Sequence, residues 1–269
     1  MTRRPDHTRV ATPSEQVRLE DLRIQFERGG ERLTALDRVN LSVAAGEFLA
    51  VVGPSGCGKS TLLNALAGLL IPTAGRILVD GKLVTGINRQ IGYVTQNDHL
   101  LPWRNLRSNV ELPLELRGYG PSERRQLAEE FIGLVGLSGF ETHYPYELSG
   151  GMRQRANIIR ALVYDPPLVV MDEPFGSLDA FTREDMQKLV LQLWERKHRT
   201  IIFITHDLSE AIVLADRVAV VSRRPGTVKA VVDIDIPRPR DAYNLRTTET
   251  FQRHYTMLWN LLASEVRTA

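Results

Sequence analysis

The sequence has little cysteine, little net charge and no long hydrophobic run. Its one cysteine, Cys57, cannot form an internal disulfide, which favours a reducing compartment. The 34 basic and 32 acidic residues leave a formal charge of +2, so composition makes no strong case for nucleic-acid binding. The least charged stretch, residues 60–75, contains polar, glycine and proline residues and is too short to span a bilayer. If the protein works at a membrane, another chain must supply the span.

The bulk composition is that of a globular protein. Of the 269 residues, 43% are hydrophobic and 25% are charged, and the length allows one large α/β domain or two small ones. Residues 1–16 are polar and basic and lack the apolar segment of a signal peptide. We therefore expect a disordered N-terminal tail and a protein that is not secreted.

The first part of the chain reads as strands followed by a glycine-rich loop. Alternating residues over 17–26 and 33–43 predict two strands joined by a turn at Gly29-Gly30. The apolar run over 48–53 predicts a buried parallel strand that leads into the loop. A helix should follow, because apolar residues then recur with helical period, at Leu62, Leu63, Leu66, Leu69 and Leu70.

The middle of the chain, about residues 100–165, reads as a helical insert. One helix there is predicted to begin at a cap on Ser122 and to carry a stripe of Leu127, Phe131, Leu134 and Val135. Beyond the insert, two apolar runs predict further strands over 167–174 and 200–207. Because a helix separates them, with its apolar face on Met186, Leu189, Val190, Leu193 and Trp194, the two strands should pair in parallel.

The C-terminal part is expected to contain two strands and a helix. The strands are predicted over 217–222 and 230–236, with a turn at Pro225-Gly226. The helix shows one apolar stripe, formed by Phe251, Tyr255, Leu258 and Leu262. Docking of this stripe on the core is favoured over a role at a membrane surface.

The glycine-rich loop carries the strongest chemical signal. Residues 53–60 fit G-x-x-x-x-G-K-S/T, in which backbone N–H groups surround phosphates, Lys59 reaches the terminal phosphates and the Ser60 hydroxyl joins a Mg²⁺ shell. The pattern arises by chance in about one chain of this size in a hundred, and its place between strand and helix lowers that figure. The predicted phosphate-binding residues are Gly53, Pro54, Ser55, Gly56, Cys57, Gly58, Lys59, Ser60 and Thr61.

Two adjacent acids, Asp172 and Glu173, end an apolar strand. Alone they would read as a solvated strand end, but beside a phosphate loop they match the need for a metal ligand and a base. Neighbouring side chains of a strand point in opposite directions, so we assign Asp172 to the metal and Glu173 to the attacking water. His206 follows another strand end, where it could contact a γ-phosphate or Glu173, or be only structural.

Three weaker signals lie elsewhere in the chain. Gln96 could bind Mg²⁺ or water through its amide, or could simply be a solvated loop residue. Phe26 could stack on adenine, although a strand aromatic is at least as often in the core. Ser149, followed by Gly150 and Gly151, should cap a helix whose start favours an anion, but these residues alone do not say whose phosphate they meet.

The ordered motifs GPSGCGKST, TQN, LSGGMRQR, VVMDEP, SLD and ITHD resemble the nucleotide-binding subunit of ATP-binding cassette (ABC) transporters over residues 17–222. The resemblance implies an α/β fold, a P-loop ATPase core with a parallel sheet, an N-terminal antiparallel β flank and an inserted α-helical subdomain. It implies a tail over 1–16, the ATPase domain over 17–240 and a C-terminal helical tail over 241–269. The implied ligands are ATP and Mg²⁺.

The resemblance also gives each motif a role. It makes Lys59 the phosphate-loop lysine, Ser60, Gln96 and Asp172 the metal-site residues, Glu173 the base and His206 the switch histidine, with Phe26 near the adenine. In the family two subunits dimerise head to tail, and each signature closes over the ATP of the other. Ser149, Gly150 and Gly151 would then contact ATP held by another copy, and Asp179, in the loop over 177–179, would lie along that copy.

The segments LLPWRNLRSNV, MDEPFGSLDAFTRE and HDLSEAIVLADRV are similar to importer ATPases of the nitrate, sulfonate and taurine type. This similarity implies a homodimer of ATPase subunits, two permease subunits and an extracytoplasmic solute-binding protein, at the cytoplasmic face of the inner membrane. An exporter ATPase is one alternative. A soluble ABC ATPase acting on nucleic acid is another, but such chains usually carry a coiled-coil insertion or a second cassette, and neither is visible here.

Overall fold

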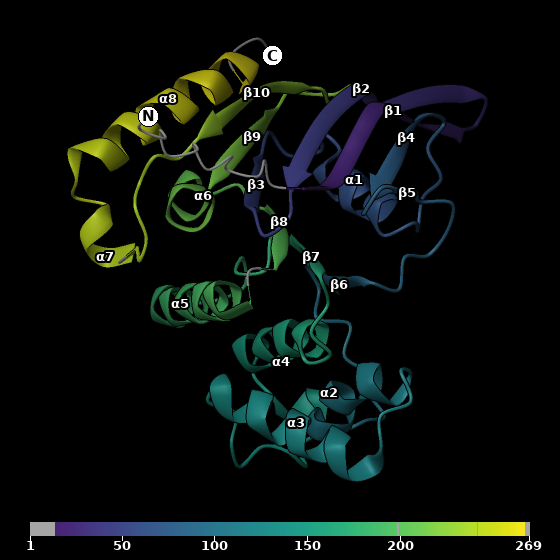
Figure 1. Cartoon of the computed structure of the whole chain (residues 1–269), viewed down its shortest axis with the longest axis vertical. Coiled ribbons are helices and arrows are strands. Elements are labelled where there is room, and N and C mark those ends of the chain that lie inside the picture. Colours follow the sequence, from purple (N-terminus) through teal and green to yellow (C-terminus); the bar gives the residue numbers. More distant parts are fainter. Residues whose placement is uncertain (1–13, 198, 241, 267–269) are drawn as a thin grey trace, which may run out of the picture.

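Two sheets and three groups of helices make up the computed structural model, which describes residues 14–197, 199–240 and 242–266 (Figure 1). The antiparallel sheet has the order β2-β1-β4-β5 and the second sheet the order β10-β9-β3-β8-β7-β6. In the second sheet the neighbouring strands β9, β3, β8, β7 and β6 are parallel, and β10 is antiparallel to β9. The antiparallel strands are β1 (Glu15–Arg28), β2 (Glu31–Ala44), β4 (Ala74–Val79) and β5 (Lys82–Leu83). The others are β3 (Phe48–Val52), β6 (Ile91–Val94), β7 (Leu168–Asp172), β8 (Thr200–Ile204), β9 (Arg217–Val221) and β10 (Val228–Asp233).

The helices cover both faces of the parallel sheet. α1 (Lys59–Leu66) lies toward the antiparallel sheet, while α2, α3 and α4 form a separate helical layer at the opposite end of the molecule (Figure 1). This layer is the predicted insert, and its helices run over Leu106–Glu115, Pro121–Leu134 and Gly150–Leu162, with a short 3₁₀ helix over Pro145–Glu147. The remaining helices are α5 (Ala180–Lys197), α6 (Leu208–Leu214), α7 (Ala242–Leu245) and α8 (Glu249–Val266).

The core is divided by the pleat of the parallel sheet. Along β3, Phe48, Ala50 and Val52 face the cluster that includes the helical layer, whereas Leu49 and Val51 face α1 and the antiparallel sheet. All five side chains are buried, as expected of a parallel strand with both faces covered. The predicted parallel pairing of the strand after the insert with the next one is confirmed between β7 and β8.

Several predicted boundaries differ from the structure. β1 begins at Glu15, so the last two residues of the predicted tail are in a strand, and residues 1–13 lie outside the described part of the chain. The cap predicted at Ser122 is wrong, because α3 starts at Pro121 with Gly120 as its N-cap. Proline suits the first helical position, where its fixed φ is already helical and its missing N–H is not needed.

The helix after the glycine-rich loop is also shorter than predicted. α1 ends at Leu66, and Gly68 then adopts a left-handed backbone with φ +71°. Leu69 is consequently 56% exposed, while Leu70 still packs against the core. β10 likewise ends at Asp233 rather than 236, although Ile234 and Ile236 remain buried beyond it.

The C-terminal helix is docked on the core, as predicted. Phe251 and Leu258 of α8 are buried, and Tyr255 and Leu262 pack beside them. The helix contacts α6 and β9. None of the helices in the described residues is long and apolar enough to cross a membrane.

Arg240, which follows the last strand, ties the C-terminal segment to the core. The side chain is buried, and its guanidinium donates to five backbone carbonyls. These acceptors are the carbonyls of Ile212, Val213, Ala215, Ile234 and Ile236. Burial lowers the pKa of Arg240 to about 10, so the group stays charged at neutral pH. One cation thus satisfies the end of α6 and the chain beyond β10 together.

Arg240→Ala should therefore lower the free energy of unfolding by about 3 kcal/mol, because several buried carbonyls lose a charged donor at once. Urea denaturation followed by circular dichroism measures the change. Arg253→Ala is the control: its exposed ion pair with Asp235 should contribute less than about 1 kcal/mol. Equal losses in the two variants would contradict this role of Arg240.

Candidate functional site

The glycine-rich loop lies between β3 and α1 and turns through left-handed backbone conformations. Gly56 has φ +73° and Gly58 has φ +105°, values that side chains with a Cβ rarely adopt. A Cβ at Gly58 would also come within 2.7 Å of Leu36 Cδ2 and within 3.0 Å of the Ala35 carbonyl. Gly58 is thus required by its backbone conformation and by packing against β2, in addition to the close approach of a phosphate.

Lys59, at the start of α1, is folded back over this loop. Its Nζ donates to the Gly53 carbonyl at 2.8 Å and to the Pro54 carbonyl at 3.0 Å. The residue is only 7% exposed, so these two acceptors compensate much of the loss of solvation of the ammonium group. The positive charge is therefore held at the loop.

Cys57 is buried within the same loop. Burial raises the pKa of its thiol, which keeps the sulfur protonated at neutral pH. This agrees with the interpretation of Cys57 as a small filler residue. Arg224, which was not assigned a role in the site, donates from Nη2 to the Gly56 carbonyl at 2.9 Å.

Asp172 faces the loop from the end of β7. The side chain is buried, and burial raises its pKa, while a hydrogen bond with Ser60 and the charge of Lys59 lower it. Glu173, the next residue, has a left-handed backbone with φ +44°, which is uncommon for a residue other than glycine. The direction of the Glu173 side chain relative to that of Asp172 is therefore set by this left-handed turn as well as by the alternation of side chains along a strand.

His206 lies beside Glu173 at the end of the neighbouring strand. Its Nδ1 is 3.1 Å from Glu173 Oε2, and the His206 side chain is 67% exposed. The distance is that of a hydrogen bond between the imidazole ring and the carboxylate. Of the contacts considered from sequence, the structure thus shows the one with Glu173.

The remaining predicted residues lie on other elements of the chain. Phe26 is 38% exposed on β1, which excludes the core interpretation. Gln96 is exposed in the loop after β6. Ser149 caps α4, because its hydroxyl accepts from the Met152 amide at 3.3 Å. Asp179 caps α5 by accepting from the Thr182 amide at 3.1 Å.

The signature residues lie away from the phosphate loop of their own chain. Ser149, Gly150 and Gly151 begin α4, which Figure 1 shows on the opposite side of the parallel sheet from α1. The structure therefore brings Lys59, Ser60, Asp172, Glu173 and His206 together. It does not bring the signature to them within one chain.

Three side chains of α4 fasten the loop that contains Gln96, a link that no motif predicted. The bonds run from Arg153 Nε to Asp98 Oδ2 (3.0 Å), from Asn157 Nδ2 to Thr95 O (2.9 Å) and from Arg160 Nη1 to His99 O (2.8 Å). The donors follow the helical repeat at intervals of four and three residues, so they share one face of α4. The helical spacing of Arg153, Asn157 and Arg160 was the sequence signal that could have indicated a shared binding face on α4.

A phosphate loop between a buried strand and a helix, faced by an acidic strand end and a histidine, defines a P-loop nucleotide-binding protein. A family model described as ABC transporter matches residues 36–176. The chain belongs to this family. It is an ATP-binding subunit that hydrolyses ATP, and the predicted α/β fold is confirmed.

Relatives of known family are similar over most of the chain. An uncharacterized ABC transporter ATP-binding protein of Methanocaldococcus jannaschii is 48% identical over 93% of this chain and 92% of its own length. The taurine import ATP-binding protein TauB of Yersinia pestis is 50% identical over 72% of this chain and 76% of its own. The aliphatic sulfonates import ATP-binding protein SsuB of Bacillus cereus is 40% identical over 84% of this chain and 88% of its own length.

A solved structure gives the same fold. A dimeric ATP-binding cassette in a post-hydrolysis state, bound to ADP and Pi, superposes with a TM-score of 0.76 at 33% identity. It covers 82% of this chain and is itself covered completely. The nucleotide-binding part of the predicted ligand set is thus confirmed.

Asp172→Asn should make the protein more stable at pH 7. Because burial raises the pKa of Asp172, the ionised carboxylate is less favourable in the folded state than in the unfolded chain. Its contribution to stability therefore falls as the pH rises from the ordinary aspartate pKa through the raised one. The amide removes this cost, and we expect the midpoint of thermal unfolding to rise by about 2 °C at pH 7.

The gain should shrink as the pH is lowered to the ordinary range of aspartate, which thermal unfolding across a pH series measures. Asp235→Asn is a control of opposite sign, because a hydrogen bond with His254 lowers the pKa of Asp235. That variant should gain nothing at pH 7. Destabilisation of the protein by Asp172→Asn at pH 7 would show that the raised pKa is not the dominant effect.

Proposed function

We propose that this chain energises the uptake of a small solute, of the taurine or sulfonate kind, through separate permease subunits. The observation that carries this proposal is the similarity to two import ATP-binding proteins over most of the chain. We further propose a homodimer at the cytoplasmic face of the inner membrane, together with two permease subunits and an extracytoplasmic solute-binding protein.

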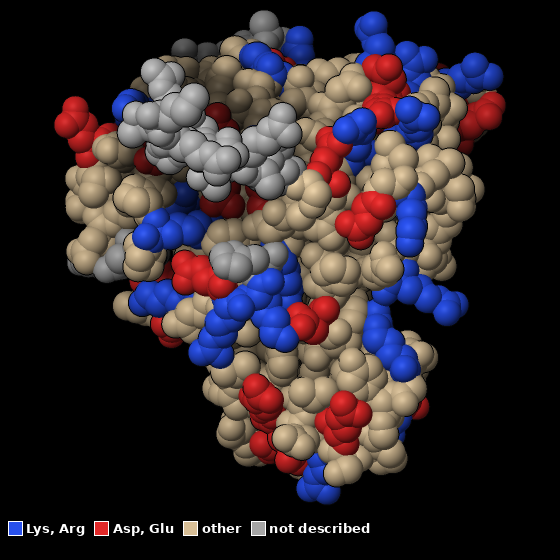
Figure 2. Space-filling view, in the orientation of Figure 1, with Lys and Arg blue, Asp and Glu red and all other residues tan. Residues whose placement is uncertain are grey.

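Interspersed charge supports a transport role over one on nucleic acid. Figure 2 shows basic and acidic side chains mixed over the viewed face, and the net charge of the chain is +2. Proteins that bind nucleic acid generally gather Lys and Arg on one face or stripe. The exporter alternative gains nothing from the taurine and sulfonate relatives, both of which are import proteins.

In the proposed reaction, Lys59 holds the terminal phosphates and Glu173 accepts a proton from the attacking water. His206 donates to Glu173, which orients that carboxylate toward its task. The neighbouring oxygens of Ser60 and Asp172 fit Mg²⁺, which prefers such hard ligands, and Gln96 would add an amide oxygen. When bound, Mg²⁺ would neutralise charge on the phosphate oxygens.

The loop residues complete the nucleotide site. The backbone of residues 53–61 would enclose the phosphates, and Phe26 would stack on the adenine. We place Ser149, Gly150 and Gly151 against the γ-phosphate held by the other subunit, with Asp179 beside that subunit's loop. The distance of α4 from α1 within one chain supports this assignment, as does the dimeric state of the similar cassette (Figure 1).

Glu173→Gln should lower ATP turnover by roughly 10² to 10⁴-fold, because the amide keeps the shape of the side chain but cannot accept the proton. Steady-state phosphate release measures the loss, and gel filtration with ATP should show a stable dimer. Glu129→Gln, at an exposed ion pair of α3, is the matched control and should hydrolyse ATP at the wild-type rate. Normal turnover by Glu173→Gln would refute its role as the base.

A further inference from the structure

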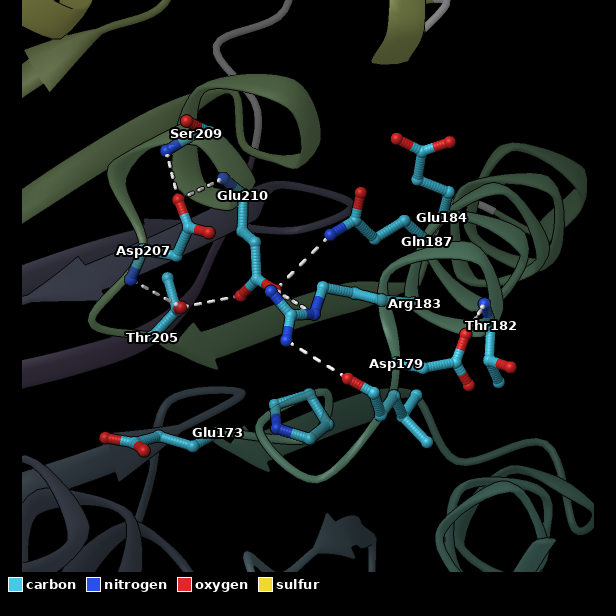
Figure 3. A network of polar contacts seen from close by, with 12 residues as sticks. Glu173, Asp179, Thr182, Arg183, Glu184, Gln187, Thr205, Asp207, Ser209 and Glu210 are labelled. Carbon is cyan, nitrogen blue, oxygen red and sulfur yellow. Dashed lines mark hydrogen bonds and ion pairs between the residues drawn. The ribbon is translucent and has the colours of Figure 1, made fainter. Parts of the chain in front are cut away.

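Glu210, a buried carboxylate of α6, lies between two loops of the proposed site (Figure 3). It is only 5% exposed, although charged side chains are rarely buried unless they are paired. Burial raises the pKa of Glu210, while its hydrogen bond with Thr205 and the charge of Arg183 lower it. Its two oxygens are shared between groups on different sides.

One oxygen of Glu210 holds the loop of the switch histidine. Thr205 Oγ1 donates to Glu210 Oε2 at 2.6 Å, and the Asp207 amide donates to the same hydroxyl at 3.0 Å (Figure 3). The residues before and after His206 are thus fixed through one hydroxyl. The position of His206 beside Glu173 depends on this arrangement.

The other oxygen faces α5. Gln187 Nε2 donates to Glu210 Oε1 at 3.3 Å, and Arg183 Nε lies 3.8 Å from the same oxygen (Figure 3). Arg183 in turn donates from Nη2 to the Leu178 carbonyl at 3.1 Å. Leu178 directly precedes Asp179, so this chain of contacts reaches the loop that we place along the partner subunit.

The ion pair with Arg183 is extended. At 3.8 Å it is longer than a hydrogen bond, and Arg183 Nε has no hydrogen-bond partner within the described residues. A movement of about 1 Å would close this contact to hydrogen-bond length. Such a movement would tighten the link between the two loops.

We propose that Glu210 is a positioning residue that couples the placement of His206 to that of the loop before Asp179. The inference rests on the proposed function of this site. A shift of His206 toward a γ-phosphate would pull on Thr205 and Glu210, and Arg183 would transmit the shift to the Leu178 carbonyl. Each ATP site would in this way set the loop that faces the other subunit.

Glu210→Gln tests this link, because the amide keeps the acceptor for Thr205 but removes the charge that attracts Arg183. The variant should fold, since burial already disfavours the ionised carboxylate. We expect kcat for ATP hydrolysis to fall about tenfold, as for a misplaced catalytic group, while KM for ATP stays within about twofold. The thermal midpoint should not fall.

Glu184→Gln is the matched control. Glu184 lies on α5, next to Arg183, and has an ion pair of nearly equal length, 3.7 Å to Arg246 in the C-terminal segment. It should keep the wild-type kcat. Arg183→Gln should reproduce the loss seen in Glu210→Gln, and the double variant should be no slower than either single variant, because all three break one link.

Wild-type kcat in Glu210→Gln, an equal loss in Glu184→Gln, or additive losses in the double variant would each overturn the proposal. Lys59→Ala is assayed in parallel to separate it from the proposed function. If Lys59→Ala hydrolyses ATP normally, the proposed site itself is wrong. If Lys59→Ala is inactive and Glu210→Gln is normal, only the role of Glu210 fails.

Discussion

Parallel pairing of three strands determines where the chemistry of this protein can occur. β3 pairs with β8 and β8 with β7, in a register that sets Val51 and Asp172 on either side of Ile204. The ladder continues past the strand ends, since the Glu173 amide donates to the Ile204 carbonyl and the Thr205 amide to the Val51 carbonyl. The phosphate loop, the acids and the histidine loop therefore leave the sheet at one edge, as in other open α/β sheets.

The same constraint leaves the signature apart from the phosphate loop of its own chain. Strand ends can gather only the loops that come directly after them, and the signature begins α4 in the helical layer (Figure 1). The helix is in turn fastened to the loop of Gln96 through Arg153, Asn157 and Arg160. These bonds hold the signature helix and the loop of Gln96 together as one packed unit.

The parts of the site that follow local motifs could be predicted from the sequence. Asp172 and His206 stand at or just after the end of a recognisable strand pattern, Lys59 stands in the loop motif that follows one, and the sheet brings such positions together. The ends of helices were harder, because the stop at Leu66 depends on Gly68 and the start of α3 on Pro121. The periodic pattern of apolar residues continues through both positions, so it does not predict where α1 ends or where α3 starts.

The network around Glu210 could not be predicted in this way. Its members come from the loop after β8, from α5 and from α6. From sequence alone, a glutamate in the polar first turn of a short helix is expected to be solvated, and only the packing of α6 shows that it is buried. The left-handed turn at Glu173 was missed for a related reason, since the ladder to Ile204 and the contact with His206 stabilise it. Long-range contacts, rather than local propensity, determine both features.

The central claim is that each ATP is bound between the phosphate loop of one subunit and the signature of another. Mixing a Lys59→Ala chain with a Ser149→Arg chain tests it most directly, by ATP hydrolysis at varied ratios. Each variant alone should be inactive, and a mixture should recover activity with a maximum at equal amounts, roughly a quarter of the wild-type rate if dimers form randomly. A mixture as inactive as its components would show that the two half-sites act within one chain, and would contradict the account.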